Sequence, residues 1–520
     1  MTRGAWMRIV AALVLFAAGY AIANRFQLAH GVLYRFAAGD SDGGVFAFLF
    51  MMFQAAVFLA ALLVFPRRWA ALLLALAGAS ILVNIGYTQI IPELVDGGTL
   101  AWMIAEVRQA GHAAGQFGGA FLSTGLQTAA ALALFIAARH LVRRTVMLPW
   151  NKPLAALLLF LLFIPSPIYR DFEVWPEGAE RNIYGLGVDL LLAPPPPPRG
   201  SVDIARDQDA PTPRHIVWLV DESVAEASFA KLIKPGLATI PHLDFGVAAA
   251  LGNCSAPAQV ALRSGVDVRR AAPATDLRTT PSIWGYARAA GYRTTLIDGQ
   301  TAGAPQNLML PPERALIDDY RPMVGGIDRD LRIAAAINAE MKSGRKSFTY
   351  AVLRGVHFQY RDHYPAGAIP ANSPVALQYE TALRWSKGRF FERLLAGVDR
   401  ESVAIVYTSD HGQNLTPGAL PHCSREAVAD EFRVPLLAFL PAREAVRYAA
   451  APRSGHSASQ IFPATLGWMG YDRAAAARYD EDLTKATARY VWFGRTVIPL
   501  AKGDTVSVTA GPDFPGSAPR

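Results

Sequence analysis

Long apolar runs without charge dominate the first third of the chain and limit what it can fold into. Residues 45–65, 69–91 and 118–138 contain no charged side chain. Each run exceeds the roughly 18 to 20 residues that a helix needs to cross the hydrocarbon core of a bilayer. A soluble helix of this length would carry a polar stripe, which these runs lack. We therefore expect membrane-spanning helices in this part of the chain.

Two further apolar runs extend this pattern. Residues 9–23 follow Arg3 and Arg8 and end in an Ala-Ile-Ala sequence, so they form either a first span or a signal peptide. We favour the span, because other spans follow directly. Residues 153–168 are shorter and end at Pro165 and Pro167, as expected of a helix that stops at a membrane surface. The prediction is a transmembrane domain of about five helices over residues 1–169.

Basic residues set the expected orientation of this bundle. With five spans and a cytoplasmic N-terminus, the inside segments hold Arg3, Arg8, Arg67, Arg68, Arg139, Arg143, Arg144 and Lys152. The loop at residues 92–117 carries three acidic residues and one arginine, which suits the outside. The positive-inside rule then places everything after residue 169 outside the cytoplasm. We attribute the net charge of +8 to cytoplasmic loops and expect no nucleic-acid partner.

Residues 170–214 are interpreted as a linker. Their first part, residues 170–192, is expected to form an interfacial helix on the membrane. Prolines at positions 194–198 favour a stiff polyproline II spacer, and a polar stretch follows at residues 199–214.

From residue 215 onward, short apolar strands alternate with helical segments. Strands are predicted at residues 216–220, 292–297, 348–353, 404–408 and 435–440, and helices at 282–290, 330–342, 378–395 and 457–469. This alternation favours an α/β domain with a mostly parallel sheet over residues 215–520.

Residues of metal-ligand type follow three of these strands. Glu222 comes just after the first, His357 after the third, and the pair Asp410 and His411 after the fourth. The carboxyl ends of parallel strands meet at one edge of a sheet, so these side chains are expected to converge. Carboxylates with imidazoles suit zinc or manganese. A single Asp-His pair is usually a turn or a cap, but three independent strand ends favour a metal site.

Ser255 is the candidate nucleophile. A serine hydroxyl is unreactive near neutral pH unless a base or a metal lowers its pKa. A helix is predicted to begin here and continue through Leu262, so its N-terminus would stabilise an alkoxide and an attached phosphate. The alternative is that Ser255 simply caps this helix. Both interpretations can hold together.

These motifs resemble a known family. Residues 407–415 read Tyr-Thr-Ser-Asp-His-Gly-Gln-Asn-Leu, similar to a Ser-Asp-His-Gly-Glu-Ser-Leu motif, and Glu222 lies in a segment similar to Gly-Glu-Thr. His357 lies where the family has Gly-Ser-His-Gly, and Tyr379 and His422 also match family positions. The C-terminal domain thus resembles the alkaline phosphatase and sulfatase superfamily. With the preceding spans, the chain most resembles the membrane-bound phosphoethanolamine transferases that modify lipopolysaccharide.

The resemblance implies a set of site residues. A catalytic zinc, with manganese as the alternative, would be held by Glu222, Ser255, Asp410 and His411. A second zinc or the substrate phosphate would be held by His357 and His422. Ser255 stands where the family usually has threonine. Gln259 stands where the sulfatase signature has arginine, which argues against formylglycine and sulfate ester hydrolysis. We expect His363 and His456 outside the ligand set, His363 in a surface loop and His456 at the surface or behind the ligands.

The resemblance also implies an activity. Phosphoethanolamine would pass from phosphatidylethanolamine, through a covalent Ser255 intermediate, to lipid A, a core sugar or another envelope glycan. The enzyme would be a multi-pass protein of the bacterial inner membrane with its catalytic domain in the periplasm. A membrane-anchored phosphodiesterase or sulfatase-type hydrolase is one alternative, and a non-catalytic scaffold is another. The sequence leaves open the acceptor, the number of metals and whether Cys254 and Cys423 form a disulfide.

Overall fold

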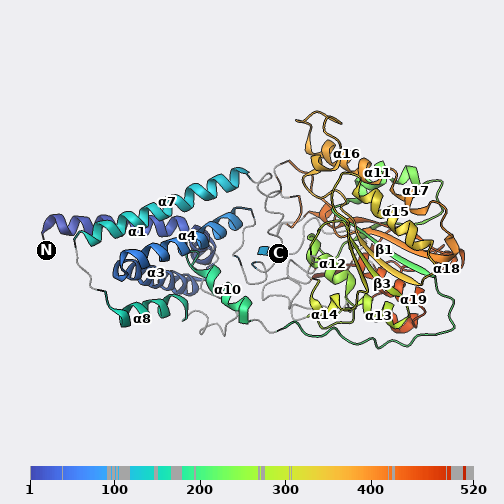
Figure 1. Cartoon of the computed structure of the whole chain (residues 1–520), viewed down its shortest axis with the longest axis horizontal. Coiled ribbons are helices and arrows are strands. Elements are labelled where there is room, and N and C mark those ends of the chain that lie inside the picture. The colour runs from blue at the N-terminus through green and yellow to red at the C-terminus, as the bar shows by residue number, and fades with distance from the viewer. Residues whose placement is uncertain are drawn as a thin grey trace. The chain divides into compact units, whose positions relative to one another are not determined.

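The computed structural model of the chain divides into two compact units, Met1–Pro194 and Pro195–Arg520 (Figure 1). The described residues are 2–37, 39–90, 95, 100, 103–104, 118–145, 150–164, 178–192, 195–267, 270, 276–303, 305, 307, 309–417, 419, 421–423, 428–487, 489–492 and 507–510. Most of the predicted loop at 92–117 lies outside them, as do Pro165 and Pro167.

The first unit is helical. Four of its described helices are long and apolar enough to cross a membrane, judged by length and composition: α1 (Arg3–Ala23), α3 (Ser41–Val64), α4 (Arg67–Ile90) and α7 (Gly118–Arg143). The fifth apolar run forms α8 (Lys152–Phe163), which has 12 residues. Its length of about 18 Å is shorter than the hydrocarbon core of about 30 Å. The described residues therefore confirm four of the five expected helices as long enough to span a membrane. The shorter π-helix η1 (Gln27–Leu33) and α2 (Tyr34–Ala37) lie between α1 and α3.

A buried polar network fixes the segment before α10 (Asn182–Leu192) within this unit. The side chains of Asn84 and Asn182 exchange two hydrogen bonds of 2.6 and 2.8 Å. Asn24 accepts a hydrogen bond from the backbone N–H of Ala179 at 2.8 Å and donates one to Glu180 at 3.0 Å. Unpaired polar groups in apolar surroundings are costly, so these pairs hold the segment against α1 and α4. Within the predicted interfacial helix at residues 170–192, residues 179–182 are thus buried in the bundle and α10 forms the remainder, while residues 170–177 lie outside the described part.

An eight-stranded sheet forms the centre of the second unit. Its strand order is β4-β3-β5-β1-β6-β7-β2-β8. The strands are β1 (His215–Asp221), β2 (Leu243–Ala249), β3 (Arg293–Asp298), β4 (Asp319–Pro322), β5 (Ser347–Val352), β6 (Val403–Ser409), β7 (Arg433–Phe439) and β8 (His456–Ser457). The sheet is mixed, because β7 runs antiparallel to both β6 and β2, whereas the other neighbours are parallel.

Helices cover both faces of this sheet (Figure 1). Along β1, Ile216, Trp218 and Val220 join one apolar cluster, and Val217 and Leu219 join the other. The first cluster contains residues of α12 (Ser255–Arg263), α13 (Ile283–Ala289) and α19 (Ile461–Trp468). The second contains residues of α11 (Glu226–Leu232), α15 (Arg329–Met341), α16 (Val375–Lys387) and α17 (Phe390–Leu395). A strand buried on both faces needs apolar residues at successive positions, as β1 has.

Shorter elements complete the second unit. They are η3 (Lys234–Leu237), α14 (Pro311–Arg314), η4 (Tyr360–His363), η5 (Arg400–Ser402), η6 (Ala429–Glu431), α18 (Ala442–Arg447), η7 (Ala458–Gln460), α20 (Arg473–Ala476), β9 (Arg489–Trp492) and β10 (Ser507–Ala510). The prediction of a single helix over residues 378–395 was wrong. The chain forms α16 and α17 instead, separated at Gly388, a residue type of low helix propensity.

A buried lysine joins the elements beneath the sheet edge that carries the ligand-type residues. The ammonium of Lys387 lies 3.1 Å from the Asp221 carboxylate and 2.6 Å from that of Asp330, and all three side chains are buried. Asp330 also accepts hydrogen bonds from the backbone N–H groups of Arg354 and Gly355 at 2.9 and 3.1 Å. Burial raises the pKa of Asp221 to about 6, although the positive charge of Lys387 opposes the rise. This ion group therefore ties the end of β1 to α15 and to the loop after β5.

We predict that Lys387→Met strongly destabilises the C-terminal unit. The substitution leaves two buried carboxylates without their cation, and breaking a buried pair in this way costs about 3–5 kcal/mol of unfolding free energy. Lys231→Met is the matched control, because Lys231 pairs with Glu380 while its own side chain is 63% exposed. Pulse proteolysis in urea, read by mass spectrometry of C-terminal peptides, measures both variants. Equal midpoints for the two variants would contradict the role given to Lys387.

Candidate functional site

Three buried ligand-type side chains converge at the carboxyl ends of β1 and β6. Glu222 follows β1, and Asp410 and His411 follow β6, which is its parallel neighbour. One ligand atom from each of the three residues lies within 4.8 Å of the others. The register that pairs Asp221 with Ser409 places the next residues of both strands opposite each other. The sequence prediction that these strand ends converge is borne out for β1 and β6.

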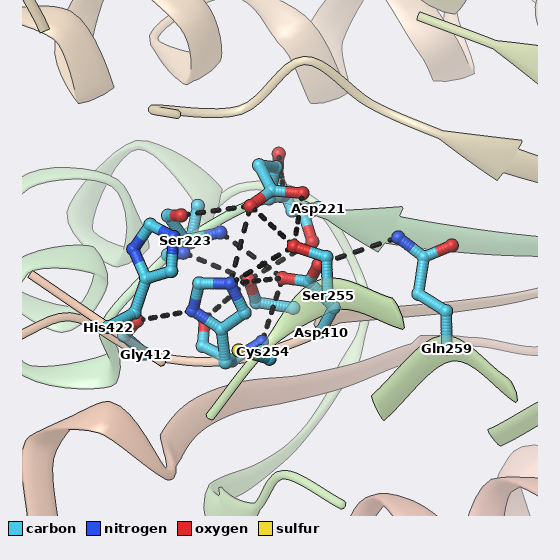
Figure 2. Close-up of polar contacts among 12 residues, drawn as sticks. Asp221, Ser223, Cys254, Ser255, Gln259, Asp410, Gly412 and His422 are labelled. Atoms are coloured by element: carbon cyan, nitrogen blue, oxygen red, sulfur yellow. Dashed lines mark hydrogen bonds and ion pairs between the residues drawn. The ribbon is translucent and has the colours of Figure 1, made fainter. Parts of the chain in front are cut away.

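Ser255 completes the cluster from a third element. It is the first residue of α12, and Cys254 occupies the cap position. The Ser255 Oγ lies 3.0 and 3.2 Å from the two carboxylate oxygens of Glu222 and 3.2 Å from Nε2 of His411. Figure 2 shows the hydroxyl directed into the cluster. The sequence left open whether Ser255 is a nucleophile or simply caps the helix. The position of its hydroxyl, in contact with the ligand residues, agrees with the nucleophile interpretation.

Burial and mutual charge shift the pKa values of the cluster. Burial, together with the negative charge of Glu222, raises the pKa of Asp410 to about 8. Burial lowers the pKa of His411, but the charges of Asp410 and Glu222 outweigh it and raise the value to about 9. Burial also opposes ionisation of Glu222, yet its hydrogen bond and attraction to His411 hold its pKa well below the usual range. At neutral pH the cluster thus holds protons that a cation would displace.

This donor set fits a divalent metal ion. Two buried carboxylates side by side repel each other, and a cation between them removes that repulsion. Carboxylate oxygens and an imidazole nitrogen are donors that suit zinc and manganese. Nδ1 of His411 lies 2.8 Å from the carbonyl oxygen of Gly412, which leaves Nε2 facing Glu222 and Ser255. A hydrogen bond of this kind fixes the ring orientation of a metal ligand.

His357 and His422 lie beside this group. The His422 ring centroid is 4.5 Å from that of His411 and 6.1 Å from that of His357. Nδ1 of His422 lies 3.1 Å from the amide oxygen of Gln413, and Nδ1 of His357 lies 2.6 Å from the carbonyl oxygen of Phe358. Burial and the neighbouring imidazoles hold the pKa of His422 well below its usual range. The structure thus brings both residues next to the cluster, and the ligand that they would hold stays a prediction.

His363 and His456 are both buried, so the expected surface loop at His363 was wrong. Nε2 of His363 lies 2.7 Å from the carbonyl oxygen of His357, and η4 turns its ring inward despite the adjacent charged residues. Burial lowers the pKa of His363 to about 3, with the charge of Arg354 adding to the effect. The His456 ring lies between the Gln460 side chain and the carbonyl oxygen of Pro452, at 3.0 and 2.9 Å.

A disulfide joins two segments of the site. Cys254 and Cys423 are bonded, with Cα atoms 4.8 Å apart and a sequence separation of 169 residues. The bond links the residue before Ser255 to the residue after His422. The backbone N–H of Cys423 also donates to the carbonyl oxygen of Asn253 at 2.8 Å. The pairing that the sequence left open is therefore present, and it holds the loop of His422 to the start of α12.

Several uncharged side chains support the ligands. The Tyr379 hydroxyl donates to the carbonyl oxygen of Ser223 and accepts from the N–H of Ala225, both at 2.8 Å, which fixes the turn after Glu222. Gln259 approaches Asp410 from the right in Figure 2, with its amide nitrogen 3.4 Å from the carboxylate. Gln300 donates a hydrogen bond to Glu222 at 2.7 Å, and it was not identified as a site residue from the sequence. It follows β3, so the same search of strand ends would have found it.

Comparisons with known proteins agree with this fold. Residues 215–471 match the family model described as sulfatase. No curated protein sequence matches the chain. Among solved structures, the integral membrane protein lipooligosaccharide phosphoethanolamine transferase A from Neisseria meningitidis is 13% identical, with a TM-score of 0.54. The alignment covers 91% of this chain and 96% of that one, so the two share a fold.

A second solved structure is the C-terminal periplasmic domain of EcEptC from Escherichia coli in complex with zinc. It is 16% identical, with a TM-score of 0.46, and the alignment covers 56% of this chain and 90% of that one. The family-model match spans β1 to α19 and contains every residue of the cluster. Residues 215–471 of this chain therefore form a domain of sulfatase type.

Proposed function

We propose that the chain is a metal-dependent phosphoethanolamine transferase of the bacterial inner membrane, with its C-terminal domain in the periplasm. The donor is phosphatidylethanolamine, and the acceptor is lipid A, a core sugar or another envelope glycan. The observation that carries this proposal is the Ser255 hydroxyl, held within hydrogen-bond distance of Glu222 and His411 in a buried ligand cluster. The fold shared with the integral membrane transferase from Neisseria meningitidis supports the pairing of this site with apolar helices.

Glu222, Asp410, His411 and the Ser255 oxygen would hold the catalytic zinc. Zinc held there would lower the pKa of the Ser255 hydroxyl and would offset negative charge on the phosphoryl group. Ser255 lies at the N-terminus of α12, where backbone N–H groups favour an attached phosphate. In the first step Oγ forms a bond to phosphorus while the bond from phosphorus to the diacylglycerol oxygen breaks. The serine proton leaves with diacylglycerol.

The second step returns Ser255 to its starting state. An acceptor hydroxyl or phosphate oxygen attacks the phosphorus, the bond to Oγ breaks, and Oγ regains a proton. His357 and His422 lie beside the cluster and are assigned to the phosphoryl oxygens, either directly or through a second metal. Positioning and charge stabilisation supply most of the rate in phosphoryl transfer, and this arrangement offers both.

Ser255→Ala tests the nucleophile. Without Oγ no bond to phosphorus forms, so transfer of labelled headgroup from phosphatidylethanolamine in proteoliposomes falls by about three orders of magnitude or more. Intact-protein mass spectrometry detects the phosphoethanolamine adduct on the parent chain and none on the variant. Ser402→Ala, in η5 on the protein surface, is the control that retains activity. A Ser255→Ala variant with parental activity would refute the assignment.

The same assay distinguishes a transferase from the two alternative functions, a hydrolase and a scaffold. Label on an envelope lipid or glycan supports transfer, whereas release of free phosphoethanolamine supports a hydrolase. No turnover and no bound metal would support a scaffold. Mass spectrometry of envelope lipids and glycans, from cells with and without the protein, then identifies which acceptor gains phosphoethanolamine.

Zinc binding is predicted to depend on pH. In the metal-free protein the raised pKa values of Asp410, about 8, and His411, about 9, leave both groups protonated at pH 7. Coordination needs an ionised carboxylate and a neutral imidazole, so binding at pH 7 releases protons. The affinity for zinc therefore rises from pH 7 to pH 9 and falls as the pH drops. Titration calorimetry in two buffers of different ionisation enthalpy measures the release, and identical heats in both buffers would contradict it.

A further inference from the structure

We propose that Gln300 is a positioning residue that makes Glu222 bind the metal through one carboxylate oxygen. This inference rests on the proposed metal site. Gln300 lies on the Oε2 side of Glu222 and outside the proposed ligand set.

The two oxygens of Glu222 have different surroundings. Oε1 accepts hydrogen bonds from the hydroxyls of Ser223 and Ser255, both at 3.0 Å, and lies 3.3 Å from Nε2 of His411. Oε2 accepts its shortest hydrogen bond, 2.7 Å, from the amide nitrogen of Gln300, with the Ser255 hydroxyl at 3.2 Å. The Glu222 side chain is fully buried, so water does not compete for these oxygens. Oε1 is therefore the oxygen placed toward the imidazole, and Oε2 is the oxygen tied to the amide.

The fold holds Gln300 firmly in this place. The carboxylate of Asp298, at the end of β3, accepts hydrogen bonds from the backbone N–H groups of Gln300 and Thr301 at 2.8 and 3.2 Å. The Gln300 amide also donates to the carbonyl oxygen of Leu353 at 3.2 Å, which attaches it to the end of β5.

Gly299 allows this close approach. A Cβ atom at position 299 would lie 2.9 Å from the carbonyl oxygen of Val352 and 3.1 Å from the backbone nitrogen of Arg354. The loop after β3 can thus press against the loop after β5 only with glycine at this position. The Asp298 carboxylate therefore holds the backbone of Gln300, and the carbonyl oxygen of Leu353 holds its side-chain amide, before any metal binds.

The chemistry of an amide suits this task. The neutral N–H donor of Gln300 engages a lone pair of Oε2, whereas the metal would replace the Ser255 proton that now lies on Oε1 beside His411. A second metal–oxygen bond, to Oε2, is therefore disfavoured. A lysine here would neutralise the carboxylate and compete with the metal, and an added carboxylate would repel Glu222. Hydrogen bonds behind a metal ligand orient it, and their loss typically costs tenfold to hundredfold in metal affinity.

The test compares zinc affinity with a spectroscopic measure of coordination. Gln300→Met keeps the length of the side chain and removes the amide, and Gln300→Ser is a second variant that leaves space. In chelator competition with the full chain in detergent, both are expected to bind zinc about tenfold to hundredfold more weakly than the parent. The cobalt-substituted variants are expected to show weaker visible absorption, because Glu222 then binds through both oxygens and raises the coordination number. Gln378→Met is the matched control, since its amide donates to the carbonyl oxygen of Ser373 and has no contact with the cluster.

The outcomes separate this inference from the proposed function. Parental zinc affinity and an unchanged cobalt spectrum in both folded variants would overturn the role of Gln300 and leave the metal site standing. A parent chain that binds no zinc would overturn both. Variants that bind weakly, with altered cobalt spectra and cooperative melting of the metal-free protein, would establish the positioning role. Loss of cooperative melting in both variants would assign Gln300 to folding and overturn it.

Discussion

The burial of two carboxylates against one imidazole is the constraint on which the C-terminal domain depends. Glu222 and Asp410 carry charge that repels when both are ionised, and water is excluded from both. A fold selected only for stability would place apolar side chains there. The domain instead holds these groups at the ends of two adjacent parallel strands, with the Ser255 hydroxyl against them. This arrangement is costly without a cation and favourable with one, which is why we interpret it as a functional site.

The surroundings of the cluster explain how the fold tolerates it. Lys387 lies between Asp221, the residue before Glu222, and Asp330. Its ammonium group offsets the negative charge of these two carboxylates. The Tyr379 hydroxyl holds the turn after Glu222, and the disulfide attaches the loop of His422 to the helix of Ser255. These supports come from α16, the segment between β6 and β7, and the start of α12. Ligand geometry therefore depends on packing across both faces of the sheet, beyond the local sequence around each ligand.

The membrane unit uses polar groups in a comparable way. Long apolar helices give little specificity by themselves, because one apolar face packs against lipid as well as another. The paired amides of Asn84 and Asn182, and the contacts of Asn24 with residues 179 and 180, supply specific partners instead. They fix the start of the segment that leads toward the C-terminal unit. A hydropathy pattern reveals the helices but not these cross-chain pairs.

The sequence by itself determined the apolar helices, the alternation of strands and helices, and the strand ends that carry Glu222, Asp410 and His411. These features follow from local periodicity and from residue type, which a linear pattern records. Only the tertiary structure decided that β7 runs antiparallel, that His363 is buried, that Cys254 and Cys423 are bonded, and that Gln300 reaches Glu222. Each of these depends on contacts between residues distant in the chain, whose free energies arise from packing and burial that no local pattern encodes.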